Sequence, residues 1–134
     1  MEASLVRQVW QRAHGRCEYC QLSQEFDERP FEIDHIISRK HQGPTVVGNL
    51  ALSCFRCNSF KGSDISGRDP KTRKITGLFN PRRHKWARHF RWQGAYLIGR
   101  TPVGRVTVAL LHINDDYRVE LREGLIDEGV FPPA

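Results

Sequence analysis

The stretch FEIDHIISRKHQGPTVVGNLALSCFRCNSFKG, residues 31–62, decides the fold of this 134-residue chain. Apolar and polar residues alternate over residues 31–37, which predicts a strand. Residues 41–45 are rich in breakers and predict a loop, and residues 49–52 predict the returning strand. Residues 54–61 predict a short helix that Gly62 ends. The expected order is therefore strand, loop, strand, helix.

Two CxxC pairs frame this unit. Cys17 and Cys20 precede the first strand, and Cys54 and Cys57 open the helix. A CxxC turn places two thiolates on one side of a tight loop, so two such turns can complete a closed, tetrahedral zinc site of the structural kind. The alternatives are four unligated cysteines or a thioredoxin-like redox pair. We expect zinc, which would staple the outside of the strand-loop-strand unit and add to its stability.

The flanking segments predict further elements. Residues 4–14 have apolar side chains at helical spacing, and residues 21–29 are polar and predict a loop. Residues 63–76 are too polar for a core and predict a surface loop. Residues 96–98 predict a strand, and Thr101-Pro102 predict the start of a helix that runs to about Leu111. A last helix would begin at residue 115 or 116, with Val119, Leu121, Leu125 and Ile126 on its buried side.

The distribution of charge is more informative than the net charge of +6. The net charge is zero over residues 1–60, +10 over residues 61–105 and −4 over residues 106–134. A basic middle segment suggests a polyanionic partner, most simply nucleic acid, although a solvated basic surface would have the same composition. No run of about 18 apolar residues and no secretory signal is visible, so we expect a cytoplasmic protein without membrane association.

The motifs together resemble a known family. Cys17-x2-Cys20, Asp34-His35-Ile36, Gly48-Asn49-Leu50 and Cys54-x2-Cys57-Asn58-x2-Lys61-Gly62 look like an HNH endonuclease of the zinc-stapled kind. The resemblance covers residues 17–62, and the stretch from Leu78 to Arg105 also looks like the extension of many small bacterial and cyanobacterial HNH proteins. It implies an α+β protein with a ββα-metal (His-Me finger) core. Residues 1–66 would form the nuclease core, and residues 67–134 would form a basic loop and an extension packed on it as one compact unit.

The resemblance also implies the roles of four residues. His35 would be the general base that deprotonates the attacking water, because the pKa of histidine ordinarily lies near working pH. Asp34 and Asn58 would bind a single catalytic Mg²⁺ or Mn²⁺, and Asn49 would hold the loop between the strands and so orient His35. Asn58 stands where the family often has histidine, and its amide oxygen favours a hard ion over zinc at this position.

Each of these residues also has an ordinary structural reading. His35 could be a structural histidine, Asn49 a turn residue and Asn58 a helix cap. Lys61 could add charge near the phosphate or be a solvated lysine, and His41 is a surface residue or a phosphate contact. The conjunction of the motifs favours catalysis.

Residues 82–92 interleave basic and aromatic side chains. Their spacing favours a buried aromatic face with Trp86 and Phe90 inward, although Trp86 or Trp92 could stack on a base. The candidate nucleic-acid contacts share a positive charge in or near this segment: Lys61, Arg82, Arg83, Lys85, Arg88 and Arg91. We expect metal-dependent hydrolysis of phosphodiester bonds in DNA, with low sequence specificity and RNA left open. The alternative is a non-catalytic zinc-knuckle module that binds nucleic acid, and the oligomeric state is unknown, with a monomer as the default.

Overall fold

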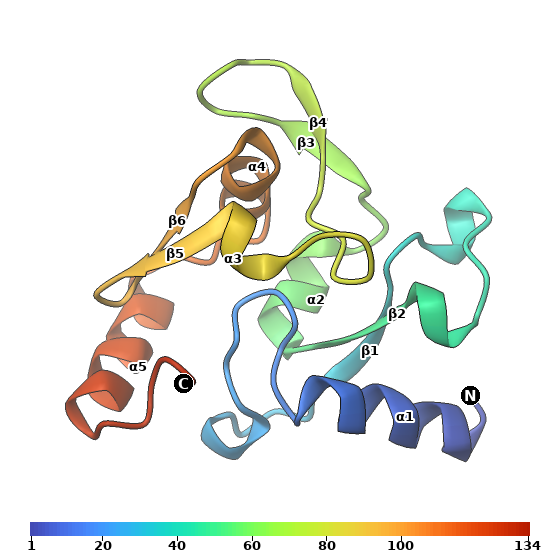
Figure 1. Cartoon of the computed structure of the whole chain (residues 1–134), viewed down its shortest axis with the longest axis horizontal. Helices are drawn as coiled ribbons and strands as arrows, with labels where there is room; N and C mark the ends of the chain where they lie inside the picture. Colours follow the sequence, from blue (N-terminus) through green and yellow to red (C-terminus); the bar gives the residue numbers. More distant parts are fainter. The chain divides into compact units, whose positions relative to one another are not determined.

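The computed structural model describes all residues from 1 to 134 and shows a mixed α/β protein that divides into two compact units (Figure 1). Unit 1 comprises residues 1–65 together with residues 80–84, and unit 2 comprises residues 66–79 and 85–134. The expected boundary between residues 66 and 67 lies close to the first of these divisions. Because residues 80–84 belong to the first unit, the division is not a single cut in the chain.

Unit 1 begins with helix α1 (Ala3–Ala13), which buries Val9 and ends where His14 takes a left-handed conformation. A hairpin-like knuckle follows, then the short 3-10 helix η1 (Gln24–Phe26). Trp10 of α1 stacks on Phe31, with ring centroids 6.2 Å apart. The predicted helix over residues 4–14 is confirmed, and its apolar stripe supplies one wall of the core.

The centre of unit 1 is the antiparallel pair of β1 (Glu32–His35) and β2 (Leu50–Ser53), followed by α2 (Phe55–Lys61). In the register of this pair, Asp34 lies opposite Ala51 and His35 lies opposite Leu50. All four residues of β2 are buried, which explains its apolar run. The connection between the strands carries two 3-10 helices, η2 (Arg39–His41) and η3 (Val47–Asn49). The predicted order of strand, loop, strand and helix is therefore observed.

Unit 2 contains two further antiparallel pairs and three helices. Strands β3 (Ser66–Arg68) and β4 (Ile75–Gly77) form one pair, and β5 (Phe90–Gln93) and β6 (Tyr96–Gly99) form the other. The one-turn helix α3 (Trp86–His89) leads directly into β5. Helix α4 (Pro102–Leu110) contacts β3, β4 and β6, and α5 (Asp116–Asp127) follows it.

The prediction of a loop over residues 63–76 is wrong, because β3 and β4 form a hairpin there. Asp69 holds the turn: its carboxylate accepts hydrogen bonds from the backbone of Lys71 and Thr72. It also accepts two hydrogen bonds from the guanidinium of Arg105, at 3.0 and 2.9 Å. Polar contacts rather than apolar burial hold this hairpin, so its sequence lacks the alternation that would have predicted it.

Several smaller predictions can be compared with the structure. Thr101 caps α4 through its hydroxyl, which accepts from the backbone N–H of Gly104 at 3.1 Å, as predicted. Trp86 packs on Phe90 with ring centroids 5.1 Å apart, but Phe90 belongs to a strand and not to a longer helix. The prediction that Leu121 is buried is wrong: α5 instead buries Arg118 and Arg122, whose guanidinium groups donate to backbone carbonyls. None of the helices is long and apolar enough to span a bilayer.

Candidate metal and active site

Four cysteines converge in unit 1 and are positioned to bind a metal. We call Cys17, Cys20, Cys54 and Cys57 the four-cysteine cluster; their Sγ atoms all lie within 4.8 Å of one another, and all four residues are buried. The Sγ atoms of Cys20 and Cys54 are 3.7 Å apart. Tetrahedral zinc with Zn–S bonds of about 2.3 Å would place its sulfurs about 3.8 Å apart, so the donor set and its spacing fit zinc.

The surroundings of the four-cysteine cluster disfavour thiolates when no cation is bound. Burial raises the pKa of the Cys17 thiol, and hydrogen bonding to neighbouring thiols raises the pKa of the Cys54 thiol. Four thiolates crowded away from water would repel one another, whereas a divalent cation favours their deprotonated form. Cys54 also caps α2, because its Sγ accepts from the backbone N–H of Cys57 at 3.4 Å.

His35 ends β1 and is half-buried, and its ring is held from one side. The Nε2 atom lies 2.8 Å from the Oγ1 atom of Thr45. The guanidinium of Arg39 donates to the same Thr45 oxygen at 3.3 Å. This series of contacts from Arg39 through Thr45 engages Nε2 of His35. The other ring nitrogen, Nδ1, is therefore the one available to a water molecule.

Asn49 closes the loop that carries these residues. Its Oδ1 accepts from the backbone N–H of Ile37 at 2.9 Å, and its Nδ2 donates to the carbonyls of Ile37 and Pro44, each at 2.9 Å. Gly43 lies so close to the Ile37 carbonyl that a Cβ atom there would fall 1.7 Å from its oxygen. Any larger residue at position 43 would open the loop, and with it the segment that leaves His35.

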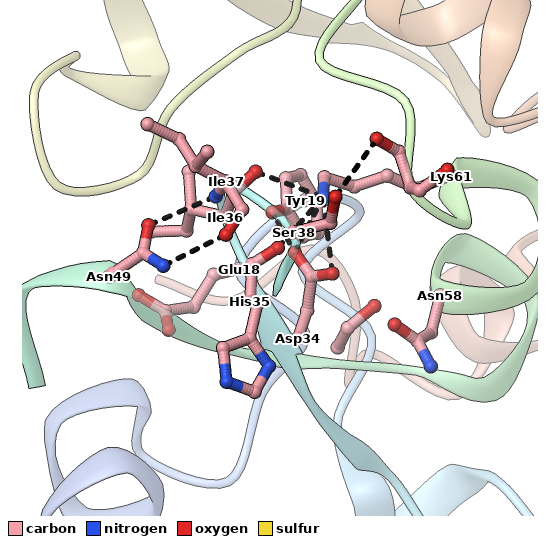
Figure 2. A network of polar contacts seen from close by, with 12 residues as sticks. Glu18, Tyr19, Asp34, His35, Ile36, Ile37, Ser38, Asn49, Asn58 and Lys61 are labelled. Carbon is pink, nitrogen blue, oxygen red and sulfur yellow. Dashed lines mark hydrogen bonds and ion pairs between the residues drawn. The ribbon is translucent and has the colours of Figure 1, made fainter. Parts of the chain in front are cut away.

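Asp34 is 4% exposed, and both of its carboxylate oxygens are engaged (Figure 2). The hydroxyl of Tyr19 donates to Oδ2 at 2.6 Å, and Nζ of Lys61 lies 3.1 Å from each oxygen. Burial raises the pKa of Asp34, and the Lys61 ammonium and the Tyr19 hydroxyl oppose that shift. These two donors satisfy the buried carboxylate, and its remaining lone pairs could take a cation.

Asn58 is the middle residue of α2, and its Nδ2 donates to the carboxylate of Glu32. Its amide oxygen faces the side of Asp34 in Figure 2. Asp34, His35 and Asn58 line one pocket of about 230 Å³, together with Ile33, Ser38, Arg39, Gly62 and Ser63. Asp34, His35 and Asn58 therefore line the same open pocket, and a carboxylate and an amide oxygen are the kinds of donor that could hold Mg²⁺ or Mn²⁺.

The prediction that Lys61 contacts nucleic acid is wrong. Lys61 is 1% exposed, and its Nζ donates to Asp34 and to the carbonyls of His35 and Ile36, each of these at 3.2 Å. The ammonium has three protons, and its hydrogen bonds go to three acceptors within the protein. The spacing along the helix could not reveal this, because the partners lie more than 24 residues away in the sequence.

Arg82 does not fit its predicted role either. Its guanidinium is mostly buried and donates to the carboxylate of Glu18 and to the Leu50 carbonyl. Glu18 in turn accepts from the backbone N–H of Leu52 at 2.8 Å. Arg82 thus ties residues 80–84 to β2 within unit 1, which leaves it little surface for a phosphate.

The other basic candidates are exposed. Arg83 belongs to unit 1, and Lys85, Arg88 and Arg91 belong to unit 2. Trp86 and Trp92 pack on each other with centroids 6.0 Å apart, and Trp92 meets Phe131 at 5.0 Å. The aromatic side chains of this segment therefore pack within unit 2, and the exposed charges remain predicted contacts.

Sequence reasoning missed three residues of the site: Tyr19, Arg39 and Thr45. Tyr19 lies between the two cysteines of the first CxxC pair and looks like filler in the sequence. Arg39 and Thr45 lie in the loop between His35 and Asn49. Their place between two candidate site residues was the only sign in the sequence that they could belong to the site.

Comparison with known proteins agrees with this geometry. Residues 17–64 match the sequence model of the HNH endonuclease family. The chain is also similar to the Septu protein PtuB of Bacillus thuringiensis, with 28% identity over 104 residues. The match covers 76% of this chain but only 38% of PtuB, so the chain spans well under half the length of this relative. No solved structure gives a significant match.

Proposed function

Because residues 17–64 match the HNH endonuclease family, we propose that this protein is a metal-dependent nuclease that hydrolyses phosphodiester bonds in DNA. The observation that carries the proposal is the shared pocket of Asp34, His35 and Asn58, since a base and two oxygen ligands must face the same phosphate. In this proposal β1, β2 and α2 form a ββα-metal core, and the four-cysteine cluster holds a structural zinc ion.

His35 would take the proton of the attacking water. Thr45 holds Nε2, which fixes the ring and leaves the other ring nitrogen for the water. Asn49 acts indirectly: it holds the loop that carries Thr45 by donating a hydrogen bond to the carbonyl of Pro44. Such positioning matters because general-base catalysis requires hydrogen-bonding distance between base and water.

Asp34 and Asn58 would hold a single Mg²⁺ or Mn²⁺ through a carboxylate and an amide oxygen. When bound, this cation would supply positive charge to the scissile phosphate and to the leaving oxygen. Glu32 supports the arrangement by accepting from Nδ2 of Asn58, which leaves the amide oxygen as the ligand atom.

Arg39 would hold the substrate phosphate. It is exposed and is the only lysine or arginine that lines the pocket, whereas Lys61 is buried beneath it. A guanidinium suits a phosphate because it can donate two parallel hydrogen bonds. Arg83, Lys85, Arg88 and Arg91 would contact the backbone at other positions without reading sequence.

Cleavage of supercoiled plasmid by the purified full chain tests the proposal. Wild-type protein with Mg²⁺ or Mn²⁺ should nick the plasmid, EDTA should stop it, and His35→Ala should lower the rate about 100-fold or more. His41→Ala is the matched control, because His41 is exposed and lies outside the pocket. If the variant with alanine at position 35 cuts as fast as wild type, the mechanism is wrong.

A protein that binds DNA but never cuts it would instead support a non-catalytic zinc-knuckle module. Elemental analysis tests the structural zinc site independently of cleavage, because the four-cysteine cluster should hold about one zinc per chain. Cys54→Ser should lose that zinc and destabilise unit 1, since metal binding contributes to the folding free energy.

A further inference from the structure

The four-cysteine cluster and the pocket are joined by one buried side chain. Tyr19 lies between Cys17 and Cys20, is fully buried, and donates its hydroxyl hydrogen to Oδ2 of Asp34 at 2.6 Å. The backbone of the same knuckle is tied to β2, because Glu18 N–H donates to the carbonyl of Leu52 at 2.9 Å. A shift of the knuckle would therefore move the Tyr19 hydroxyl with it.

The second donor to Asp34 is also anchored at the four-cysteine cluster. Lys61 is the last residue of α2, and that helix begins beside Cys54 and contains Cys57. Its Nζ bridges the Asp34 carboxylate and the carbonyls of His35 and Ile36 (Figure 2). Each segment that reaches Asp34 thus has one end at the four-cysteine cluster.

Stability alone does not require this arrangement. Burying an ion pair brings little net stabilisation, and well-packed apolar residues of similar volume are often as good. The Tyr19 hydroxyl and the Lys61 ammonium do, however, fix the direction of the Asp34 carboxylate at the wall of the pocket. Groups that hydrogen-bond a metal ligand orient it and tune its affinity for the metal.

We propose that Tyr19 and Lys61 are positioning residues that hold Asp34 for the catalytic cation, so that zinc loading of the four-cysteine cluster preorganises the cation site. This inference rests on the proposed function, in which Asp34 is a ligand. It adds that the structural zinc acts on the reaction through Tyr19 and α2 as well as through folding. Neither residue is expected to touch the substrate.

The test measures binding of Mn²⁺ to the zinc-loaded full chain by electron paramagnetic resonance, without DNA. Tyr19→Phe removes one hydroxyl from a buried site and keeps the ring. It should weaken Mn²⁺ binding about 10-fold or more, while zinc content stays close to wild type and stability falls only by the loss of one buried hydrogen bond. Tyr96→Phe is the matched control, since Tyr96 is exposed on β6 of unit 2, and it should bind Mn²⁺ as wild type does.

Cleavage gives a second readout that a purely structural role would not change. For Tyr19→Phe the Mn²⁺ concentration at half-maximal rate should rise about 10-fold, and DNA binding should be unchanged. Lys61→Met removes a positive charge from beside the carboxylate as well as its hydrogen bonds, so its Mn²⁺ affinity is compared with that of Tyr19→Phe only at equal zinc content. Mn²⁺ affinity within twofold of wild type in Tyr19→Phe would overturn the inference.

Asp34→Ala separates this inference from the proposed function. If wild type binds Mn²⁺, Asp34→Ala does not, and Tyr19→Phe binds like wild type, the cation site stands and the positioning role is refuted. If wild type shows no Mn²⁺ site that Asp34→Ala removes, the catalytic cation site itself is refuted, and the positioning role with it.

Discussion

Nε2 of His35 lies 2.8 Å from Oγ1 of Thr45, across ten residues of the loop between the two strands of the core. The partner of the imidazole is thus a side chain of the very loop that Asn49 closes. Orientation of the proposed base depends on the whole loop and not on β1 alone.

Replacement of Thr45 by valine keeps the volume and removes the oxygen that holds Nε2. We expect kcat for plasmid nicking to fall about 10- to 100-fold with little change in DNA affinity, because the base loses its orientation and not its chemistry. Single-turnover cleavage and a DNA-binding titration measure the two quantities. Thr45→Ser keeps the hydroxyl and should retain most of the rate; equal losses in both variants would contradict the role of the oxygen.

Arg39 and Lys40 form a matched pair for the phosphate contact. Both are exposed and adjacent, but only Arg39 lines the pocket with His35 and Asp34. Arg39→Ala should lower kcat/KM about 10- to 100-fold, whereas Lys40→Ala should change it less than threefold. Steady-state cleavage of a short duplex gives both values, and equal effects of the two substitutions would show that only general charge matters.

Arg82 and Arg83 provide a second pair, with opposite expectations. Arg82→Ala removes the ion pair with Glu18 and a hydrogen bond to Leu50, and should cost about 2 kcal/mol of unfolding free energy. Arg83→Ala should leave stability within about 0.5 kcal/mol, because Arg83 is exposed. Chemical denaturation of both variants measures these differences.

DNA binding should be affected by the Arg83 substitution and not by the Arg82 substitution, the reverse of the order expected for stability. Arg83→Ala should reduce the slope of log affinity against log salt by about one unit, as loss of one phosphate contact does. A folded Arg82→Ala protein should keep the wild-type slope. A loss of slope in Arg82→Ala alone would restore Arg82 as the phosphate contact.

The β3–β4 hairpin should respond to acid through Asp69. The guanidinium of Arg105 holds the pKa of Asp69 well below its usual range, so the ionised carboxylate is favoured in the folded state. Its contribution to stability is complete above the unfolded pKa of about 3.9 and is lost as pH falls from there toward the folded pKa. The unfolding free energy of wild type should therefore fall below about pH 4.

Asp69→Asn should be less stable than wild type at pH 7, and the difference should shrink as the pH is lowered below about 4. Comparing the two proteins at each pH cancels acid effects that they share, including protonation of the cysteines. Tryptophan fluorescence reports on unit 2 through Trp86 and Trp92 and on unit 1 through Trp10. A constant difference from pH 7 to pH 3 would contradict the role of the charge.

Short-range patterns determined the core of this protein. The two CxxC spacings, the alternation before His35, the breakers around Gly43 and the stop at Gly62 act over a few residues, so the sequence alone predicted β1, β2, α2 and the four-cysteine cluster. The match of residues 17–64 to the HNH endonuclease family follows from the same motifs. These features need no knowledge of distant partners.

Only the tertiary structure decided what the polar side chains contact. The sequence suggested Lys61 and Arg82 as nucleic-acid contacts, yet each pairs within the protein with a carboxylate far along the chain, Lys61 with Asp34 and Arg82 with Glu18. Tyr19 gains a role because the chain brings the first knuckle against β1. A charged side chain can be solvated or paired at similar free energy, so burial and partner geometry decide between the two states, and both belong to the folded chain.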